Sequence, residues 1–208
     1  MAFVKRSQTT TVGQDERGYS RDFEGLCAEL EAPNPTARRW AARDLAAHPG
    51  AAQVLIARLE VEPDAAVREA IMISLTEIGD AVTVQGLVKC LRSEDASLRN
   101  EAIEAMKHLP DTVAPVMAGL LADPEPDIRI FAVNVLESLR HPDVEQWLIE
   151  VISEDAHINV CATAVDLLGE VGTEAAVGPL EALKRRFPAE PYIEFAADLA
   201  LRRIRDEG

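Results

Sequence analysis

Apolar side chains recur along this chain at the spacing of an α-helix, and the same short pattern returns six times between residues 32 and 205. The clearest copy follows the turn Pro63–Asp64 and consists of Val67, Ile71, Leu75 and Ile78. Apolar positions at a first residue and at +4, +8 and +11 from it form one stripe on a helix of about 3.6 residues per turn. No segment alternates between apolar and polar residues as a half-buried strand would. Each copy therefore predicts an amphipathic helix.

The first apolar residue of each copy, which we call the anchor, gives the period of the repeat. The anchors stand 30, 31, 30, 32 and 33 residues apart and are Ala37, Val67, Leu98, Ile128, Val160 and Ile193. A second segment with helical spacing precedes each anchored helix, as at 82–91 and 113–121, and Asp80 and Asp111 are available there as helix N-caps. The pattern predicts two helices per unit, in units at about 22–47, 51–78, 81–109, 111–139, 143–171 and 173–205.

A pair of helices of this size cannot bury its own apolar faces, so the pairs must stack on their neighbours in a row. The sequence therefore predicts an all-α fold, a right-handed α-solenoid (superhelix) of about six helix pairs over residues 22–208. Residues 1–21 carry no helical stripe and are rich in Thr, Ser and Gln. We expect them to form a flexible N-terminal tail.

The turns and helix starts share the pattern Asp-x-x-Val-Arg-x-x-x-Ala-x-x-x-Leu, which covers most of residues 32–205. This pattern resembles the HEAT-repeat family, in the short form found in phycobilisome-lyase-like proteins, and the resemblance implies a solenoid while saying little about activity. The arginine after the anchor is present in four units and becomes Cys161 and Glu194 in the last two. We expect such arginines to bind turn carboxylates, as in Asp64 and Arg68, in a ladder that weakens toward the C-terminus.

Charge excludes several classes of partner. The chain has 208 residues with 36 acidic and 21 basic side chains, for a net charge of -15, and residues 1–21 alone carry +2. An acidic body opposes the phosphates of nucleic acid and anionic lipid. No window approaches 18 consecutive apolar residues, so we expect neither a membrane span nor a signal peptide. The three cysteines are far apart and lack CxxC spacing, which predicts a reduced, cytoplasmic protein without a disulfide or zinc site.

Candidate catalytic groups are sparse. The four histidines, His48, His108, His141 and His157, stand in turns or at helix ends. None is followed by Glu, so the His-Glu iron ligands of deoxyhypusine hydroxylase, a HEAT-like enzyme, are not matched. No glycine-rich phosphate-binding motif occurs. We therefore predict no catalytic, cofactor-binding or metal-binding residue.

A recognition surface is the remaining function. In HEAT-type stacking the anchored helices line the concave side, which places positions +2, +5, +6 and +9 near the groove. The +5 positions are apolar in the middle four units and their neighbours are mainly polar or acidic, which predicts an apolar seam with an acidic border, unless the seam packs between units. The candidate partner-binding residues are Glu69, Met72, Ile73, Asn100, Ile103, Glu104, Ile130, Val133, Asn134, Glu137, Val165 and Asp166.

We thus expect a non-catalytic scaffold or adaptor that binds a basic or amphipathic protein partner on an acidic concave surface, without nucleic acid, membrane or cofactor. The alternative, which rests on the resemblance, is a subunit of a phycobilin lyase or another tetrapyrrole-handling factor. Cys161 is the thiol that such a factor could use on a bilin.

Overall fold

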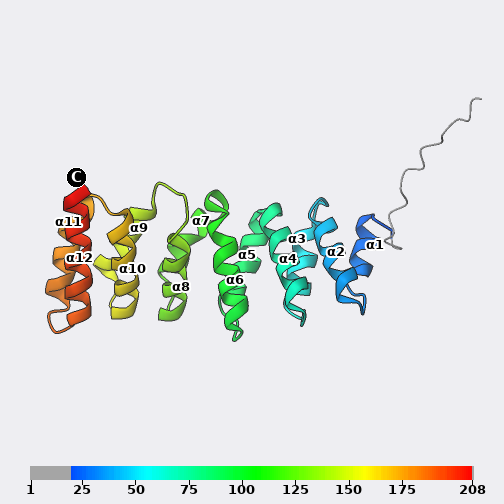
Figure 1. Cartoon of the computed structure of the whole chain (residues 1–208), viewed down its shortest axis with the longest axis horizontal. Coiled ribbons are helices and arrows are strands. Elements are labelled where there is room, and N and C mark those ends of the chain that lie inside the picture. The colour runs from blue at the N-terminus through cyan, green and yellow to red at the C-terminus, as the bar shows by residue number, and fades with distance from the viewer. Residues whose placement is uncertain (1–19, 208) are drawn as a thin grey trace, which may run out of the picture.

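The computed structural model describes residues 20–207, and this range contains twelve α-helices and no strand. The helices follow one another along a single long axis (Figure 1). The first helix of each pair is α1 (Phe23–Glu29), α3 (Ala51–Leu59), α5 (Ala81–Cys90), α7 (Pro110–Leu121), α9 (Val144–Glu154) or α11 (Glu174–Arg186). The second is α2 (Pro35–Leu45), α4 (Ala65–Ile78), α6 (Ala96–Lys107), α8 (Pro126–Leu136), α10 (Ile158–Val171) or α12 (Pro191–Glu207).

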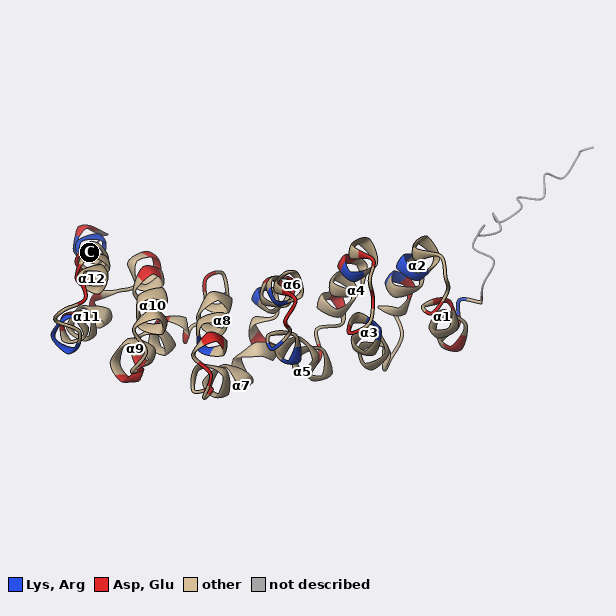
Figure 2. Cartoon of the chain, turned by 90° about the horizontal axis from the view of Figure 1, so that it is seen from below, with Lys and Arg blue, Asp and Glu red and all other residues tan. Residues whose placement is uncertain are grey.

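The helices form two rows. Figure 2 shows the even-numbered helices, which we call the inner row, on the hollow side of a shallow arch, with the odd-numbered outer row on the other side. Each inner helix packs on the next, from α2 to α12, and in the outer row α3 packs on α5 and α9 on α11. The predicted all-α solenoid of six helix pairs is confirmed. The predicted tail over residues 1–21 lies outside the described residues except for Ser20 and Arg21.

Turn carboxylates start the inner helices. One carboxylate oxygen of Asp64 accepts hydrogen bonds from the backbone N–H groups of Ala66 and Val67, at 3.0 and 3.1 Å. Asp95 caps α6 in the same way, and the side chain of Asn34 caps α2. Each such cap satisfies backbone donors that the helix leaves free and contributes about 1 kcal/mol.

One continuous core fills the space between the rows, from Leu26 in α1 to Ile204 in α12. Each outer helix contributes one central side chain that is 0% exposed. These six residues are Leu26, Leu55, Leu87, Met117, Leu148 and Leu180. Because they recur in every unit, the units share one mode of packing and differ mainly at the surface.

Two of the arginines after the anchors, Arg38 and Arg129, join their own turn to the next unit. Arg38 donates through Nη1 to the carbonyl oxygens of Ala32 and Pro33, at 2.9 and 3.1 Å. Through Nε and Nη2 it also donates to the carboxylate of Glu62, which lies 24 residues further along, at 2.8 and 2.7 Å. Arg129 and Asp155 repeat this arrangement at 2.6 and 3.0 Å. The ladder therefore holds both the turn of its own unit and the start of the following one.

The expected pairing of Arg68 with Asp64 is wrong, because Asp64 is already the cap of α4. The partner position is the residue five before the next anchor, and in the third unit this residue is Ser93. Arg68 keeps its hydrogen bond to the Glu62 carbonyl at 3.3 Å, but its buried Nε has no hydrogen-bond partner among the described residues. The next link is missing too, because Arg99 donates to the Ser93 carbonyl while Asp123 pairs with Arg92. The ladder is thus interrupted in the middle, at Arg68 and Arg99, instead of weakening steadily toward the C-terminus.

A different arginine completes the fifth turn. Cys161 occupies the ladder position there, and its thiol donates to the carbonyl oxygen of Asp155 at 3.2 Å. Arg186, from α11 of the next unit, donates to the carbonyl oxygens of Ser153 and Asp155 and to the Cys161 sulfur. The guanidinium that four units supply internally therefore comes from the neighbouring unit in the fifth.

Candidate functional site

A groove of about 760 Å³ lies between α4 and α6 on the inner row. Met72 and Ala105 contribute apolar surface to it, and Ile73, which is 42% exposed, is its exposed large apolar side chain. His108, the residue that follows α6, lines one end of the groove. The arrangement offers an apolar strip open to a partner.

Four carboxylates line the same groove, two from each helix: Glu69, Glu77, Glu101 and Glu104. Glu101 accepts a hydrogen bond from the Ser97 hydroxyl at 3.0 Å through one oxygen. Its other carboxylate oxygen is buried and has no partner among the described residues. A buried acceptor without a donor costs free energy, so this carboxylate lowers the stability of the fold.

Five of the residues singled out from the sequence meet in this groove: Glu69, Met72, Ile73, Asn100 and Glu104. Another four lie at least partly exposed further along the inner row, in α8 or α10 or just after α8: Ile130, Asn134, Glu137 and Asp166. The sequence pattern therefore identified a connected surface of α4 and α6 and a looser continuation over α8 and α10.

The proposed apolar seam is corrected by the structure. The four +5 residues of the middle units are between 0 and 6% exposed, namely Met72, Ile103, Val133 and Val165. Adjacent inner helices pack directly against one another, and that packing covers the +5 flank of each helix. Apart from the part of Met72 that reaches the groove, the seam belongs to the core between units and is not a binding surface.

A buried lysine links α6 to the residue after α8. The Lys107 ammonium donates to the carboxylates of Glu104 and Glu137, at 2.8 and 2.6 Å, and its side chain is 7% exposed. Burial alone would lower the pKa of Lys107, but the two carboxylates outweigh it and hold the pKa above its ordinary value. Sequence spacing could not identify this bridge, because Glu137 lies 30 residues away in the next unit.

The inner face is not acidic throughout. At its N-terminal end the guanidinium carbons of Arg39 and Arg43 each lie 5.8 Å from the centre of the Trp40 ring. Lys and Arg are prominent on α2 in Figure 2, and both basic and acidic segments are visible on α4 and α6. The inner face is therefore of mixed charge, and four glutamates line the α4–α6 groove.

Reactive groups are few in the part of the chain that the structure describes. Burial raises the pKa of the Cys161 thiol, and the charge of Arg186 opposes this only in part. Burial likewise raises the pKa of Cys90 to about 11. Between residues 20 and 207 no group of three His, Cys, Asp or Glu side chains could hold a metal ion. No helix in the same range is long and apolar enough to cross a membrane.

Repeated helix pairs in two rows, with a groove on the inner row, define a helical-repeat solenoid. The family model for HEAT repeats matches residues 23–107 and 113–207, so this chain belongs to the HEAT-repeat family, as its repeat pattern indicated. No curated protein gives a significant match.

Solved structures with a similar arrangement have low sequence identity. They include an engineered protein (20% identity, covering 89% of this chain and 97% of the other, TM-score 0.43). The complex of CpcE and CpcF of phycocyanin lyase from Nostoc sp. PCC7120 matches at 17% identity over 98% of this chain and 100% of the other, with a TM-score of 0.38. Human deoxyhypusine hydroxylase in complex with glycerol matches at 15% identity over 88% and 84%, with a TM-score of 0.47.

Proposed function

We propose that this protein is a non-catalytic scaffold whose α4–α6 groove binds a basic, amphipathic segment of a protein partner. The observation that carries the proposal is the combination of an exposed apolar side chain, Ile73, with four groove-lining glutamates. A partner helix with one apolar face would cover Ile73, and its flanking Lys or Arg side chains would reach the carboxylates.

The rigidity of the inner row supports the same proposal. The groove-forming helices α4 and α6 are held by packing to α2 and α8, so the groove exists before a partner arrives. A preformed surface loses little conformational entropy on binding, which leaves more of the contact free energy for affinity.

Selection of binders from a random peptide display library tests this proposal, because the selection does not require the natural partner to be identified. We expect the selected peptides to combine Lys or Arg with apolar residues at helical spacing. The variant Ile73→Glu should lose their binding, because it places a charge on the apolar strip. Val82→Glu is the matched control: Val82 is 43% exposed, lies in the outer-row helix α5, and should leave binding unchanged.

Thermal melting of both variants separates binding from folding, since both positions are exposed and both melting temperatures should stay near the wild type. Selected peptides without a basic and apolar pattern would contradict the proposal. Equal binding to both variants would also contradict it.

The tetrapyrrole alternative has a direct test in the same protein. The structure gives it no accessible thiol at the position singled out from the sequence, because Cys161 is 0% exposed. A titration with a linear tetrapyrrole should leave the absorption spectrum of the pigment unchanged. A saturable spectral shift would favour the lyase-type function over the scaffold.

A further inference from the structure

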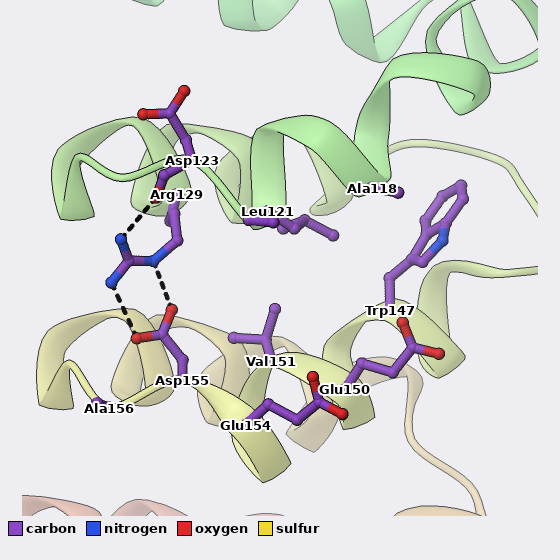
Figure 3. A pocket seen from close by; sticks show the side chains of 11 residues that line it. Ala118, Leu121, Asp123, Arg129, Trp147, Glu150, Val151, Glu154, Asp155 and Ala156 are labelled. Atoms are coloured by element: carbon purple, nitrogen blue, oxygen red, sulfur yellow. Dashed lines mark hydrogen bonds and ion pairs between the residues drawn. The ribbon is translucent and has the colours of Figure 1, made fainter.

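A second cleft lies on the opposite face of the solenoid, between the end of α7 and α9 (Figure 3). Its volume is about 450 Å³. The cleft exists because α7 and α9 do not pack on each other as α9 and α11 do, and because α7 and the residue after it present the small side chains of Ala118 and Ala122 there. It shares no lining residue with the α4–α6 groove, which lies on the inner row.

The cleft has an apolar middle and two different ends. Leu121 from α7 faces Val151 from α9 across it (Figure 3). One end is closed by the ion pair of Arg129 and Asp155, at 2.6 Å. At the other end the side chain of Trp147 rises from α9 toward α7 (Figure 3).

Trp147 is an exception among the outer helices. Trp147 directly precedes Leu148, the central buried side chain of α9. The equivalent position in the other five outer helices holds a smaller residue, so packing there does not require a large ring. These residues are Gly25, Val54, Gly86, Val116 and Pro179. The indole is held by stacking on His141, with ring centres 5.0 Å apart and an angle of 15° between the planes. A fixed aromatic ring beside a cavity is a favourable contact for a cation.

The carboxylates at the mouth are not neutralised by the protein. Within residues 20–207, Glu154 makes no hydrogen bond or ion pair, and Glu150 accepts only from the amide of Gln146, at 2.8 Å. The positive charge of Arg129 is already matched by Asp155. The mouth therefore carries two carboxylates that no basic side chain among the described residues pairs with.

Another outer cleft provides an internal comparison. Between α5 and α7 a cleft of about 400 Å³ is lined by Val88, Val116, Leu120 and neighbouring residues, with Lys89 as its charged group. Its lining contains neither an aromatic ring nor a carboxylate. The α1–α3 cleft does have an aromatic ring, Phe23, and a carboxylate, Glu31, but Arg58 pairs with that carboxylate at 2.8 Å. Of these three outer clefts, the α7–α9 cleft therefore combines an aromatic ring with carboxylates that no basic side chain in the described range neutralises.

We propose that the α7–α9 cleft is a binding site for a lysine or arginine side chain of a basic peptide segment. The methylene stem of that side chain packs between Leu121 and Val151, and its cationic head lies against Trp147 with Glu150 and Glu154 as acceptors. The cleft volume exceeds one such side chain, so adjoining backbone of the segment also enters it. This site goes beyond the proposed groove function and does not depend on it.

Fluorescence titration with tetralysine amide tests the site. The chain has two tryptophans, so Trp40→Phe makes Trp147 the sole indole reporter. We expect a saturable change in Trp147 emission. In that background the double variant Glu150→Gln, Glu154→Gln should raise the dissociation constant at least tenfold, because both charged acceptors become neutral.

Two controls separate this site from general attraction to an acidic protein. The double variant Glu170→Gln, Glu174→Gln removes the same charge from exposed positions outside the cleft and should change the dissociation constant less than twofold. Ile73→Glu, in the α4–α6 groove, should also leave it unchanged.

Three results would overturn the site: an unchanged Trp147 emission, an equal loss of affinity in the Glu170 and Glu174 control, or binding of spermidine under conditions where tetralysine does not bind. The last would assign the cleft to a free polyamine instead of a peptide.

Discussion

At the scale of single residues, the carboxylate five positions before an anchor joins two units. Glu62 accepts hydrogen bonds from Arg38, from Arg58 at 2.8 Å and from the backbone N–H of Asp64 at 2.9 Å, and its side chain is 0% exposed. Asp155 has the same role for Arg129 and for the backbone N–H of His157. A buried carboxylate with this many donors is stabilised in its charged form.

The pH dependence of stability should reveal Glu62. Burial would raise the pKa of this carboxyl, but the hydrogen bonds from Arg38, the Asp64 amide and Arg58 outweigh it and bring the pKa to about 2. A lowered folded-state pKa adds stability above the unfolded value and loses it as pH falls toward 2. We expect Glu62→Gln to lower the free energy of unfolding by about 2–3 kcal/mol at pH 7.

Urea unfolding of the wild type and Glu62→Gln between pH 7 and pH 2 checks this. The difference between the two proteins should be constant above about pH 5 and should shrink at lower pH. A difference that does not depend on pH would assign the loss to packing and not to the charge.

Ser93 is the position where a missing carboxylate can be restored. Its hydroxyl already accepts from the backbone N–H of Asp95 at 3.1 Å, as Glu62 and Asp155 accept from the amide two residues later. Ser93→Asp should therefore keep this bond and give the buried Nε of Arg68 a partner. We expect a gain of about 1 kcal/mol, or about 2–4 °C in melting temperature.

Ser138→Asp serves as the control for Ser93→Asp, because Ser138 is exposed in the loop after α8 and adds the same charge. Its melting temperature should stay within about a degree of the wild type. If Ser93→Asp melts no higher than this control, a carboxylate at position 93 does not form a stabilising hydrogen bond with Arg68.

At the scale of helices, the sequence was sufficient where the signal is local. The anchor spacing and the caps Asn34, Asp64 and Asp95 place the inner helices, because helical period and capping depend only on residues close in the chain. Which flank the neighbouring helices cover is not a local property, so the sequence left open whether the +5 seam is exposed, and the structure shows that Ile103 and Val133 are buried. The repeat pattern also could not show that Arg186 replaces the missing arginine of the fifth turn, because that contact depends on packing between units.

Close approach of α3 and α5 gives an element-scale prediction. A Cβ placed on Gly86 would lie 2.4 Å from the Cδ1 atom of Ile56, far inside van der Waals contact. Gly86→Ala should therefore lower the free energy of unfolding by about 1–3 kcal/mol through overpacking, although alanine favours a helix more than glycine.

Removing the obstructing side chain should reverse the sign of the Gly86 effect. In an Ile56→Ala background, Gly86→Ala should stabilise the protein by up to about 1 kcal/mol, since only the helix propensity remains. Denaturant unfolding of the four proteins of this cycle measures the coupling. Additive effects of the two substitutions would contradict a contact between α3 and α5 at this point.

At the scale of the whole molecule, each unit contacts only its neighbours along the row (Figure 1). Stability in such a solenoid is close to a sum of unit and interface contributions, so a local defect should remain local. The two candidate surfaces follow from the same geometry, because one groove lies on the inner row and a separate cleft lies at a gap in the outer row.

Hydrogen exchange after a core truncation tests this locality. Leu26→Ala removes a fully buried side chain of the first unit and should cost about 2–5 kcal/mol. Exchange monitored by mass spectrometry should accelerate in α1 to α4 and should stay at the wild-type rate in α10 to α12. A uniform acceleration along the chain would show that the solenoid opens as one cooperative unit.

Because Arg186 belongs to the sixth unit but binds the turn of the fifth, it affects the order in which the turns acquire their hydrogen bonds during synthesis. Four hairpins carry their own arginine and can satisfy their turn carbonyls as soon as they emerge, whereas the fifth must wait until α11 has been synthesised. A nascent chain halted after residue 171 would therefore expose an unfinished hairpin at its end. The turn carbonyls of the fifth hairpin thus receive their guanidinium only with the sixth, whereas each of the first four turns receives it from its own unit.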